Sequence, residues 1–97
     1  MSLAGAYFVC ILASRKHGTL YIGVTRHVPT RLVQHRSGRG SEFVKKYNVY
    51  TLVHVEEFAL PQKAIAREKQ LKNWHRDWKI RLIEEGNPDW SELSNLF

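Results

Sequence analysis

The sequence predicts one α+β domain in which a small three-stranded antiparallel sheet is flanked by helices. The chain has 97 residues, which leaves room for one hydrophobic core of ordinary size and excludes two. Three short runs rich in aromatic and β-branched residues alternate with segments of helical spacing. A short polar turn separates the first two runs, as in an antiparallel hairpin. We therefore expect a single domain over residues 1–97, with its core at about residues 7–90.

The predicted sheet begins at Tyr7 to Leu12, an apolar run that suits a strand buried on both faces. A polar turn at residues 15–18 leads to a second run, Thr19 to Val24, so the two form a hairpin. Gly23 weakens the second strand locally and indicates close approach of another backbone or a ligand. A third strand is predicted from Val49 to Phe58.

Proline and glycine mark the first predicted helix. Pro29 suits a first helical turn and Gly38 suits a helix end, so we expect a helix from Pro29 to Ser37. Residues 37–41 then break the chain. The segment that follows mixes positive charge with an aromatic ring and either lines a nucleic-acid groove or forms a solvated loop; it contains Lys45, Lys46 and Tyr47.

The longest predicted helix begins at Pro61 and carries apolar residues at helical spacing. We expect it to bend or break near His75 to Asp77 and to continue from Trp78 to Glu85. A short terminal helix is predicted from Asp89 to Leu96. The three tryptophans are interpreted as core anchors rather than base-stacking platforms: Trp74, Trp78 and Trp90.

The charge of the chain is unevenly distributed. There are 15 lysines and arginines against 9 acidic residues, a formal net charge of +6. From Arg15 to Lys46 eight basic residues accompany one acid, whereas from Glu84 onwards there are four acids and no base. This pattern favours a polyanionic partner, nucleic acid above all, with the basic stretch as its phosphate-binding surface. A generic basic surface is the alternative that charge counts leave open.

Cysteine content and hydropathy indicate the cellular compartment in which the protein acts. Cys10 is the single cysteine, which excludes a disulfide framework and a cysteine-rich zinc site and fits a reducing environment. The longest apolar run, Leu3 to Ala13, is shorter than the ~20 residues of a membrane span and lacks the features of a secretory signal. We expect a cytoplasmic protein that does not associate with a membrane.

Four polar side chains lie where a purely structural domain would not need them. Tyr21 precedes Gly23 by two residues in the second strand. Arg31 and His35 are four residues apart, so they share one helix face with residues that pack inward. Glu68 has apolar neighbours three and four positions away, which turn its carboxylate toward the apolar side of its helix. We expect the phenol, guanidinium, imidazole and carboxylate to converge over the sheet.

Each of these residues also has a plain structural interpretation. Tyr21 would be a core aromatic residue, Arg31 and His35 would be surface residues, and Glu68 would pair with Lys72, a contact worth only ~0.3–0.5 kcal/mol. Cys10 is interpreted as an inert core residue. The remaining histidines lack metal-ligand spacing and are interpreted as structural or exposed; they are His17, His27, His54 and His75.

Motif spacing makes the chain resemble the GIY-YIG nuclease superfamily, in particular its small single-domain, uncharacterised endonuclease-like members. The matching segments are Tyr7 to Ser14, Leu20 to Thr25 with its Tyr-Ile-Gly, and Ala64 to Lys72 with Glu68. Arg31 lies ten residues beyond Tyr21, and His35 follows it. The resemblance extends from Tyr7 to about Trp90 and implies a GIY-YIG-like α/β sandwich.

The resemblance implies hydrolysis of phosphodiester bonds in DNA with one divalent metal ion, Mg²⁺ or Mn²⁺. Glu68 takes the family's metal-binding role and Arg31 its phosphate-binding role. Tyr21 would activate or position the attacking water, and His35 would contact the phosphate or assist proton transfer. The basic stretch would guide the DNA backbone to the site through Arg31, Arg36, Arg39, Lys45 and Lys46.

Two departures from the family pattern leave an alternative open. Cys10 stands where some members carry a tyrosine that is the favoured general base, and an asparagine that many members have beyond the glutamate is missing. The alternative is a nucleic-acid-binding module of the same fold with impaired catalysis; a basic protein-interaction adaptor is a third hypothesis. The short chain leaves no room for a separate targeting domain, so a choice of branched, damaged or other DNA would come from groove shape or from a partner protein.

Overall fold

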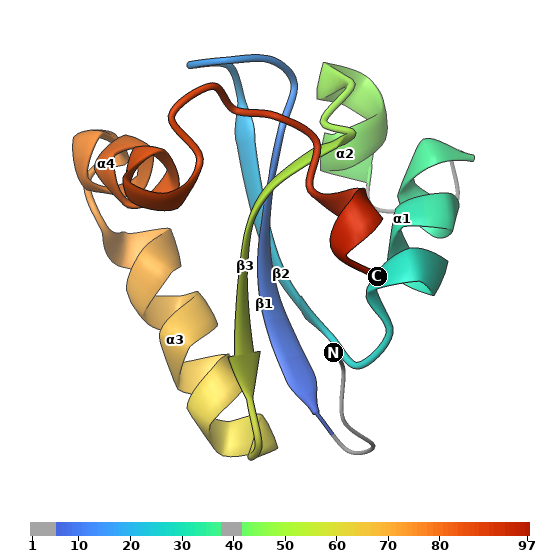
Figure 1. Ribbon diagram of the computed structural model, residues 1–97, viewed down its shortest axis with the longest axis vertical. Coiled ribbons are helices and arrows are strands. Elements are labelled where there is room, and N and C mark those ends of the chain that lie inside the picture. The colour runs from blue at the N-terminus through green and yellow to red at the C-terminus, as the bar shows by residue number, and fades with distance from the viewer. Residues whose placement is uncertain (1–5, 38–41) are drawn as a thin grey trace.

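The computed structural model describes residues 6–37 and 42–97. A three-stranded antiparallel sheet stands between two layers of helices (Figure 1), and the predicted α+β class is confirmed. The strands are β1 (Tyr7–Ala13), β2 (Leu20–Thr25) and β3 (Thr51–Phe58), in the order β2-β1-β3. Both neighbours of β1 are antiparallel to it, so the predicted hairpin and third strand are present.

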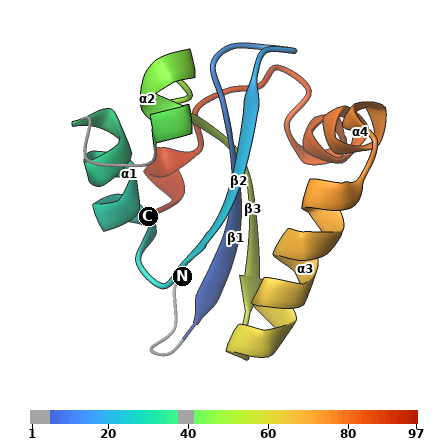
Figure 2. The same ribbon diagram turned by 180° about the vertical axis from the view of Figure 1, so that it is seen from behind.

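The helices cover opposite faces of the sheet. On one face lie α1 (Val28–Arg36), α2 (Glu42–Tyr47) and the 3₁₀ turn η1 (Ser94–Leu96), and on the other lie α3 (Pro61–Asn73) and α4 (Arg76–Gly86). The reverse view shows the same separation (Figure 2). We name these the α1 face and the α3 face. A site that uses both layers must therefore form where they meet, at an edge of the sheet.

The central strand β1 is buried on both faces, as its composition predicts. Phe8, Cys10 and Leu12 pack in the cluster of the α1 face. Val9 and Ile11, which alternate with them, pack in the cluster of the α3 face. This alternation follows from the two-residue period of a strand. A charged residue in β1 would be buried whichever face it pointed to, so the functional polar groups come from the edge strands and helices.

Gly23 in β2 pairs with Cys10 of β1. A Cβ atom at Gly23 would lie 3.1 Å from Cε1 of Tyr21, two residues earlier on the same strand. The sequence predicts close approach of another backbone or a ligand at this glycine, and the protein atoms that lie nearest are instead those of the Tyr21 ring. Gly23 therefore leaves room for the ring of Tyr21 beside its own strand.

Helix α1 begins at Val28, and the side chain of His27, for which the sequence predicts no such role, caps its first turn. The Nδ1 atom of His27 accepts a hydrogen bond from the backbone N–H of Thr30 at 3.2 Å. The cap satisfies one of the free N–H groups in the first turn. The predicted helix from Pro29 to Ser37 is thus present, with bounds one residue earlier at each end.

Two predicted features of local structure are wrong. Of the two interpretations of residues 45–47, the solvated loop is wrong, because these residues lie in α2, which is anchored by the fully buried Val44; the nucleic-acid groove stays a prediction. The terminal helix from Asp89 to Leu96 is absent, and only η1 forms there. In its place, the backbone N–H of Leu93 donates to the carbonyl of Leu52 in β3 at 2.8 Å. Hydrogen bonding to the sheet replaces the internal hydrogen bonds of a helix.

The long helical segment breaks where the sequence predicts, because Trp74 has an extended backbone between α3 and α4. Trp74 and Trp90 pack against the cluster of the α3 face, as core anchors do. The same interpretation is wrong for Trp78, whose side chain is 50% exposed. Among the described residues, no helix has the length and apolar character needed to cross a membrane.

Candidate functional site

Tyr21 and His35 meet on the α1 face of the sheet. Their ring centroids lie 5.4 Å apart, with the planes at 66°, in an edge-to-face contact. Tyr21 comes from the edge strand β2, whereas His35 comes from the last turn of α1. His35 points inward because it is one turn beyond Leu32, which packs in the core. The fold therefore joins a phenol and an imidazole that the sequence separates by 14 residues.

His35 is buried, and its Nδ1 atom has no hydrogen-bond partner among the described residues. Burial lowers the pKa of His35, and the nearby charge of Arg31 lowers it further. A neutral imidazole is therefore favoured at this position. Buried polar atoms without a partner are uncommon in proteins and point to a ligand, an ion or a water molecule. The free nitrogen of His35 marks the α1 face as a candidate site.

Arg31 lies close enough to His35 and Cys10 for its charge to lower the pKa of both. Its guanidinium offers planar donors that match the oxygens of a phosphate. Thus Tyr21, Arg31 and His35, predicted to converge, are brought together by β2 and α1. The phenol of Tyr21 contacts the buried imidazole of His35, and the permanent cation of Arg31 lies near that imidazole.

Cys10 belongs to the same face of the sheet but forms part of its floor. It is 5% exposed and lies opposite Gly23 in the hairpin. Burial raises the pKa of the Cys10 thiol to about 12, against a smaller lowering by Arg31. The thiol is therefore protonated at neutral pH and is not a nucleophile. This agrees with the interpretation of Cys10 as an inert core residue.

Glu68 lies in the other helical layer, on α3, which packs on the α3 face. Its half-buried carboxylate forms an ion pair with Lys72, with Nζ 3.6 Å from Oε2. This is the i,i+4 pair that the sequence offers as the plain interpretation of Glu68. The contacts of Glu68 thus link it to Lys72 rather than directly to the cluster of Tyr21, Arg31 and His35.

An open pocket at the free edge of β2 connects the two layers. Its volume is about 290 Å³, and its lining comes from β2, α2, α3 and α4: Leu20, Tyr21, Ile22, Phe43, Lys72 and Lys79. Tyr21 therefore shares a pocket with Lys72, the partner of Glu68. We name this hollow the β2-edge pocket. At this pocket the helical layer that carries Glu68 meets the face of the sheet that carries Tyr21.

Glu68 offers a single carboxylate, which suits a divalent cation that has few protein ligands. Among residues 6–37 and 42–97, no group of three or more histidine, cysteine or acidic side chains is arranged to hold a metal ion. A lone carboxylate such as Glu68 suits Mg²⁺, because this ion keeps several waters and takes phosphate oxygens in addition to one or two carboxylates. Glu68 therefore fits a metal ion that binds together with a phosphate.

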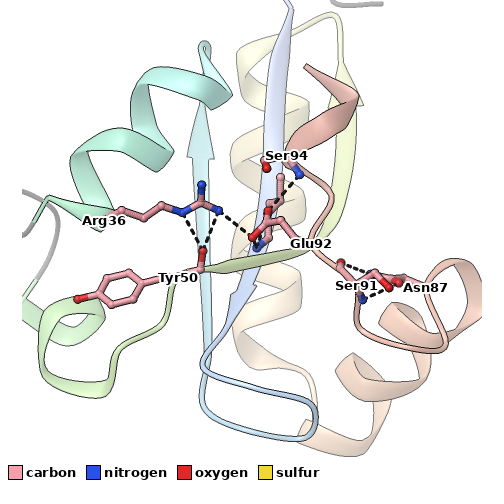
Figure 3. Close-up of polar contacts among 7 residues, drawn as sticks. Arg36, Tyr50, Asn87, Ser91, Glu92 and Ser94 are labelled. Atoms are coloured by element: carbon pink, nitrogen blue, oxygen red, sulfur yellow. Dashed lines mark hydrogen bonds and ion pairs between the residues drawn. The ribbon is translucent and has the colours of Figure 1, made fainter.

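The predicted nucleic-acid-binding residues have different surroundings. Arg36 donates from Nε and Nη2 to the carbonyl of Tyr50, and its Nη2 lies 2.7 Å from Oε2 of Glu92 (Figure 3). Lys45 and Lys46 lie on α2, with the ammonium of Lys46 5.4 Å from the ring of Tyr47. Arg39 lies outside the described residues. Arg36 thus supports the fold, while both lysines line a surface pocket.

Sequence reasoning missed three residues of the β2-edge pocket, namely Phe43, Lys72 and Lys79. A signal was present for Phe43, since it precedes Tyr47 by one helical turn. The other histidines have structural partners, as interpreted for them: His17 bonds Glu84, and His54 bonds Glu56, each at 2.8 Å.

Comparison with known proteins places the chain in a family. The sequence model of the family described as the GIY-YIG catalytic domain matches residues 6–81. A UPF0213 protein of Staphylococcus saprophyticus is 34% identical over 71 residues, which are 73% of this chain and 87% of the relative. A UPF0213 protein of Staphylococcus aureus is 32% identical over 80 residues, which are 82% of this chain and 96% of the relative.

A solved structure agrees with these matches. The solution NMR structure of a UPF0213 protein from Bacillus halodurans superposes with a TM-score of 0.57 at 26% identity, covering 94% of this chain and 96% of the other. The family predicted from the motif spacing is therefore confirmed. The chain belongs to the GIY-YIG family, whose catalytic domain carries nuclease activity that is generally metal-dependent.

Proposed function

We propose that this protein is a metal-dependent DNA endonuclease that acts in the cytoplasm as a single domain over residues 1–97, with its core at about residues 7–90. The observation that carries the proposal is the unpartnered Nδ1 of buried His35 beside Tyr21 and Arg31, in a domain of a nuclease family. A phosphate group would complete this set of groups, since it matches the donors of Arg31 and brings negative charge to a basic surface.

Hydrolysis forms a bond between phosphorus and a water oxygen and breaks the bond to one deoxyribose oxygen, which leaves with a proton. In this proposal Arg31 binds the phosphate and stabilises the charge that grows on its oxygens. Tyr21 positions or activates the water through its hydroxyl, and His35 contacts the phosphate or passes a proton. The guanidinium of Arg31 near these groups favours anionic species at this surface.

Glu68 is the proposed ligand of Mg²⁺ or Mn²⁺, the ion that would polarise the scissile phosphate. Its half-buried carboxylate is held near the β2-edge pocket by α3 and is paired with Lys72 at 3.6 Å. A pair at this distance is loose enough to open at little cost, because partly exposed ion pairs contribute only ~0–1 kcal/mol. Lys72 would then be free to bind a phosphate oxygen of the strand.

The substrate in this proposal is DNA, held by Arg31, Arg36, Arg39, Lys45 and Lys46. Lys45 and Lys46 present their charges on α2 beside the pocket that contains Tyr21. Arg36 would have to share its guanidinium between a phosphate and Glu92. A partner protein would supply specificity for branched or damaged DNA.

The test is cleavage of single-stranded, duplex and branched DNA with Mg²⁺ or Mn²⁺ by the wild-type protein and by Glu68→Gln. We expect Glu68→Gln to lose at least about 100-fold in rate, since a metal ion contributes several kcal/mol to charge stabilisation. Glu85→Gln, an exposed change on α4, serves as the control and should cleave at the wild-type rate. Absence of wild-type cleavage on every substrate, or equal rates for Glu68→Gln, would refute the proposal.

The buried thiol of Cys10 favours one alternative function, a nucleic-acid-binding module with impaired catalysis. The resemblance places Cys10 where some members have a catalytic tyrosine, and a protonated, buried thiol cannot act as a base there. This alternative predicts DNA binding that weakens with salt and no turnover in the same assay. Measurable cleavage by the wild-type protein excludes it.

A further inference from the structure

Helix α2 carries two aromatic side chains on its outer surface. Phe43 and Tyr47 are 42% and 43% exposed, and their ring centroids lie 4.9 Å apart across one helical turn. The pair lines an open pocket of about 630 Å³ whose other residues are charged, namely Glu42, Lys45 and Lys46. Two large apolar rings held together at the surface are uncommon without a binding role. We name Phe43 and Tyr47 the α2 aromatic pair.

The α2 aromatic pair is continuous with the candidate site. The ring of Phe43 lies 6.3 Å from that of Tyr21, and the two planes are inclined by only 31°. Tyr21 in turn contacts His35 at 5.4 Å. Phe43 lines both the pocket on α2 and the β2-edge pocket. A row of rings therefore leads from solvent, through Phe43, to the phenol of the proposed nuclease site.

The charges around this row suit a nucleic-acid strand. Lys45 and Lys46 line the pocket on α2 together with Phe43, and Lys72 and Lys79 line the β2-edge pocket together with Phe43. Glu42 is the acidic residue that lines the pocket on α2, and the residues that line the β2-edge pocket include no acid. Aromatic rings bordered by lysines are the arrangement that binds single strands, with the bases on the rings and the phosphates on the cations.

The other exposed aromatic residue of the helices lacks this setting. Trp78 on α4 is 50% exposed, but it packs edge-to-face on Trp74, with centroids 5.9 Å apart. The pocket that it lines contains Arg81, Leu82 and Glu85 and none of the residues around Tyr21. Trp78 therefore provides a matched control for exposed aromatic area.

We propose that the α2 aromatic pair stacks an unpaired base of the DNA substrate and so places the adjoining phosphate in the β2-edge pocket. The proposal rests on the proposed nuclease function and adds its substrate class, which is single-stranded DNA or an unpaired segment next to a duplex. A paired base keeps its faces covered by its neighbours in the helix, so it cannot stack on Phe43 or Tyr47. Stacking is tolerant of sequence, because every base presents a π face.

The first experiment measures binding without a divalent metal, so that no cleavage takes place. Fluorescence anisotropy compares a labelled single strand with a duplex of the same sequence, for the wild-type protein, Phe43→Leu, Tyr47→Leu and Trp78→Leu. We expect each α2 variant to bind the single strand about tenfold more weakly, the size of one stacking contact. Duplex binding should change less than about twofold, and Trp78→Leu should behave as wild type.

A second variant keeps the test valid if a leucine variant fails to fold. Tyr47→Trp preserves an aromatic face and should bind the single strand at least as tightly as the wild-type protein. A single strand that carries 2-aminopurine should lose fluorescence on binding the wild-type protein and regain it with Phe43→Leu, because stacking quenches this base. Equal affinity of the wild-type protein for duplex and single strand, or unchanged binding by both leucine variants, would overturn the proposal.

The outcome also separates this inference from the nuclease proposal. If no DNA is cleaved but the single strand is bound through Phe43 and Tyr47, the stacking site stands and the nuclease function fails. If duplex DNA is cleaved as fast as single-stranded DNA and both leucine variants cleave at the wild-type rate, the nuclease function stands and the stacking site fails.

Discussion

Two neighbouring side chains on β3 and α3 lower the pKa of Glu56 and so keep its carboxylate ionised. Nε2 of His54 lies 2.8 Å from one carboxylate oxygen, and Nε of Arg67 lies 2.8 Å from the other. The hydrogen bond from His54, followed by those from Arg67, lowers the pKa of Glu56 from 4.5 to about 2, against the opposing effect of burial. Arg67 continues the network, with its guanidinium 5.0 Å from the ring of Trp74.

The pKa of Glu56 predicts acid sensitivity. Because its folded pKa lies below its unfolded value, the stabilisation is complete above about pH 4.5 and is lost as the pH falls toward 2. A partly exposed carboxylate with this depression contributes roughly 1–3 kcal/mol at neutral pH after screening. We expect Glu56→Gln to lower the free energy of unfolding by this amount at pH 7.

Urea denaturation at a series of pH values checks this expectation. The difference between wild type and Glu56→Gln should shrink below pH 4.5 and vanish near pH 2. Glu57→Gln, which changes the exposed neighbour on the same strand, should leave the free energy of unfolding within about 0.5 kcal/mol of wild type. A difference that stays constant down to pH 2 would contradict the role assigned to the carboxylate charge.

At the scale of elements, the segment after α4 covers the free edge of β3. The side chain of Asn87 donates to the carbonyls of Val53 and Ser91, and its Oδ1 accepts from the N–H of Ser91. Glu92 then accepts the backbone N–H of Leu52 and pairs with Arg36 (Figure 3). These bonds occupy strand groups that β1 does not use. An edge strand covered in this way is protected from pairing with other chains.

Glu92 is predicted to be the main tether of this segment. Glu92→Ala removes the carboxylate that accepts the N–H of Leu52 and pairs with Arg36, which keeps only its hydrogen bonds to the carbonyl of Tyr50. We therefore expect a loss of roughly 1–3 kcal/mol in the free energy of unfolding. Asp89→Ala removes an exposed acid from the same segment and should change it by less than about 0.5 kcal/mol. Thermal and urea denaturation measure both. Equal effects of the two substitutions would show that loss of an acid, rather than the tether, is responsible.

For the molecule as a whole, folding rearranges the charge asymmetry of the sequence. Acids of the terminal segment return to the basic half of the chain, where Glu84 bonds His17 and Glu92 bonds Arg36. Arg36 is thereby partly neutralised, whereas Lys45 and Lys46 line the open pocket on α2. The basic surface available to a strand is therefore smaller than the net charge of +6 suggests.

This arrangement predicts the salt dependence of DNA binding. Each phosphate contact contributes about 0.7 to the slope of log affinity against log salt concentration for a single strand. Lys46→Gln should reduce the slope by about that amount, while Lys63→Gln, an exposed change in the first turn of α3, should not. Binding titrations at several salt concentrations give both slopes. A slope that is unchanged in Lys46→Gln would remove this lysine from the interface.

Residue patterns within single segments were enough to determine the fold class and the family. A continuous run of apolar residues predicted β1, proline and glycine predicted the bounds of α1, and helical spacing predicted α3. The spacing from Tyr21 to Arg31 and Glu68 predicted the family. These features are local or depend only on order along the chain. They also determine which residue types are available to the site.

Contacts between distant segments decided the rest. Only the tertiary structure placed Phe43 beside Tyr21 and brought Lys72 to the same pocket. It also replaced the expected terminal helix by two hydrogen bonds to the sheet, in which the N–H of Leu52 donates to Glu92 and the N–H of Leu93 donates to the carbonyl of Leu52. No periodicity encodes such pairings, because each depends on which face of which element packs against the sheet. The sequence by itself therefore determined the family and the chemistry available, whereas packing against the edge strands decided how those groups are combined.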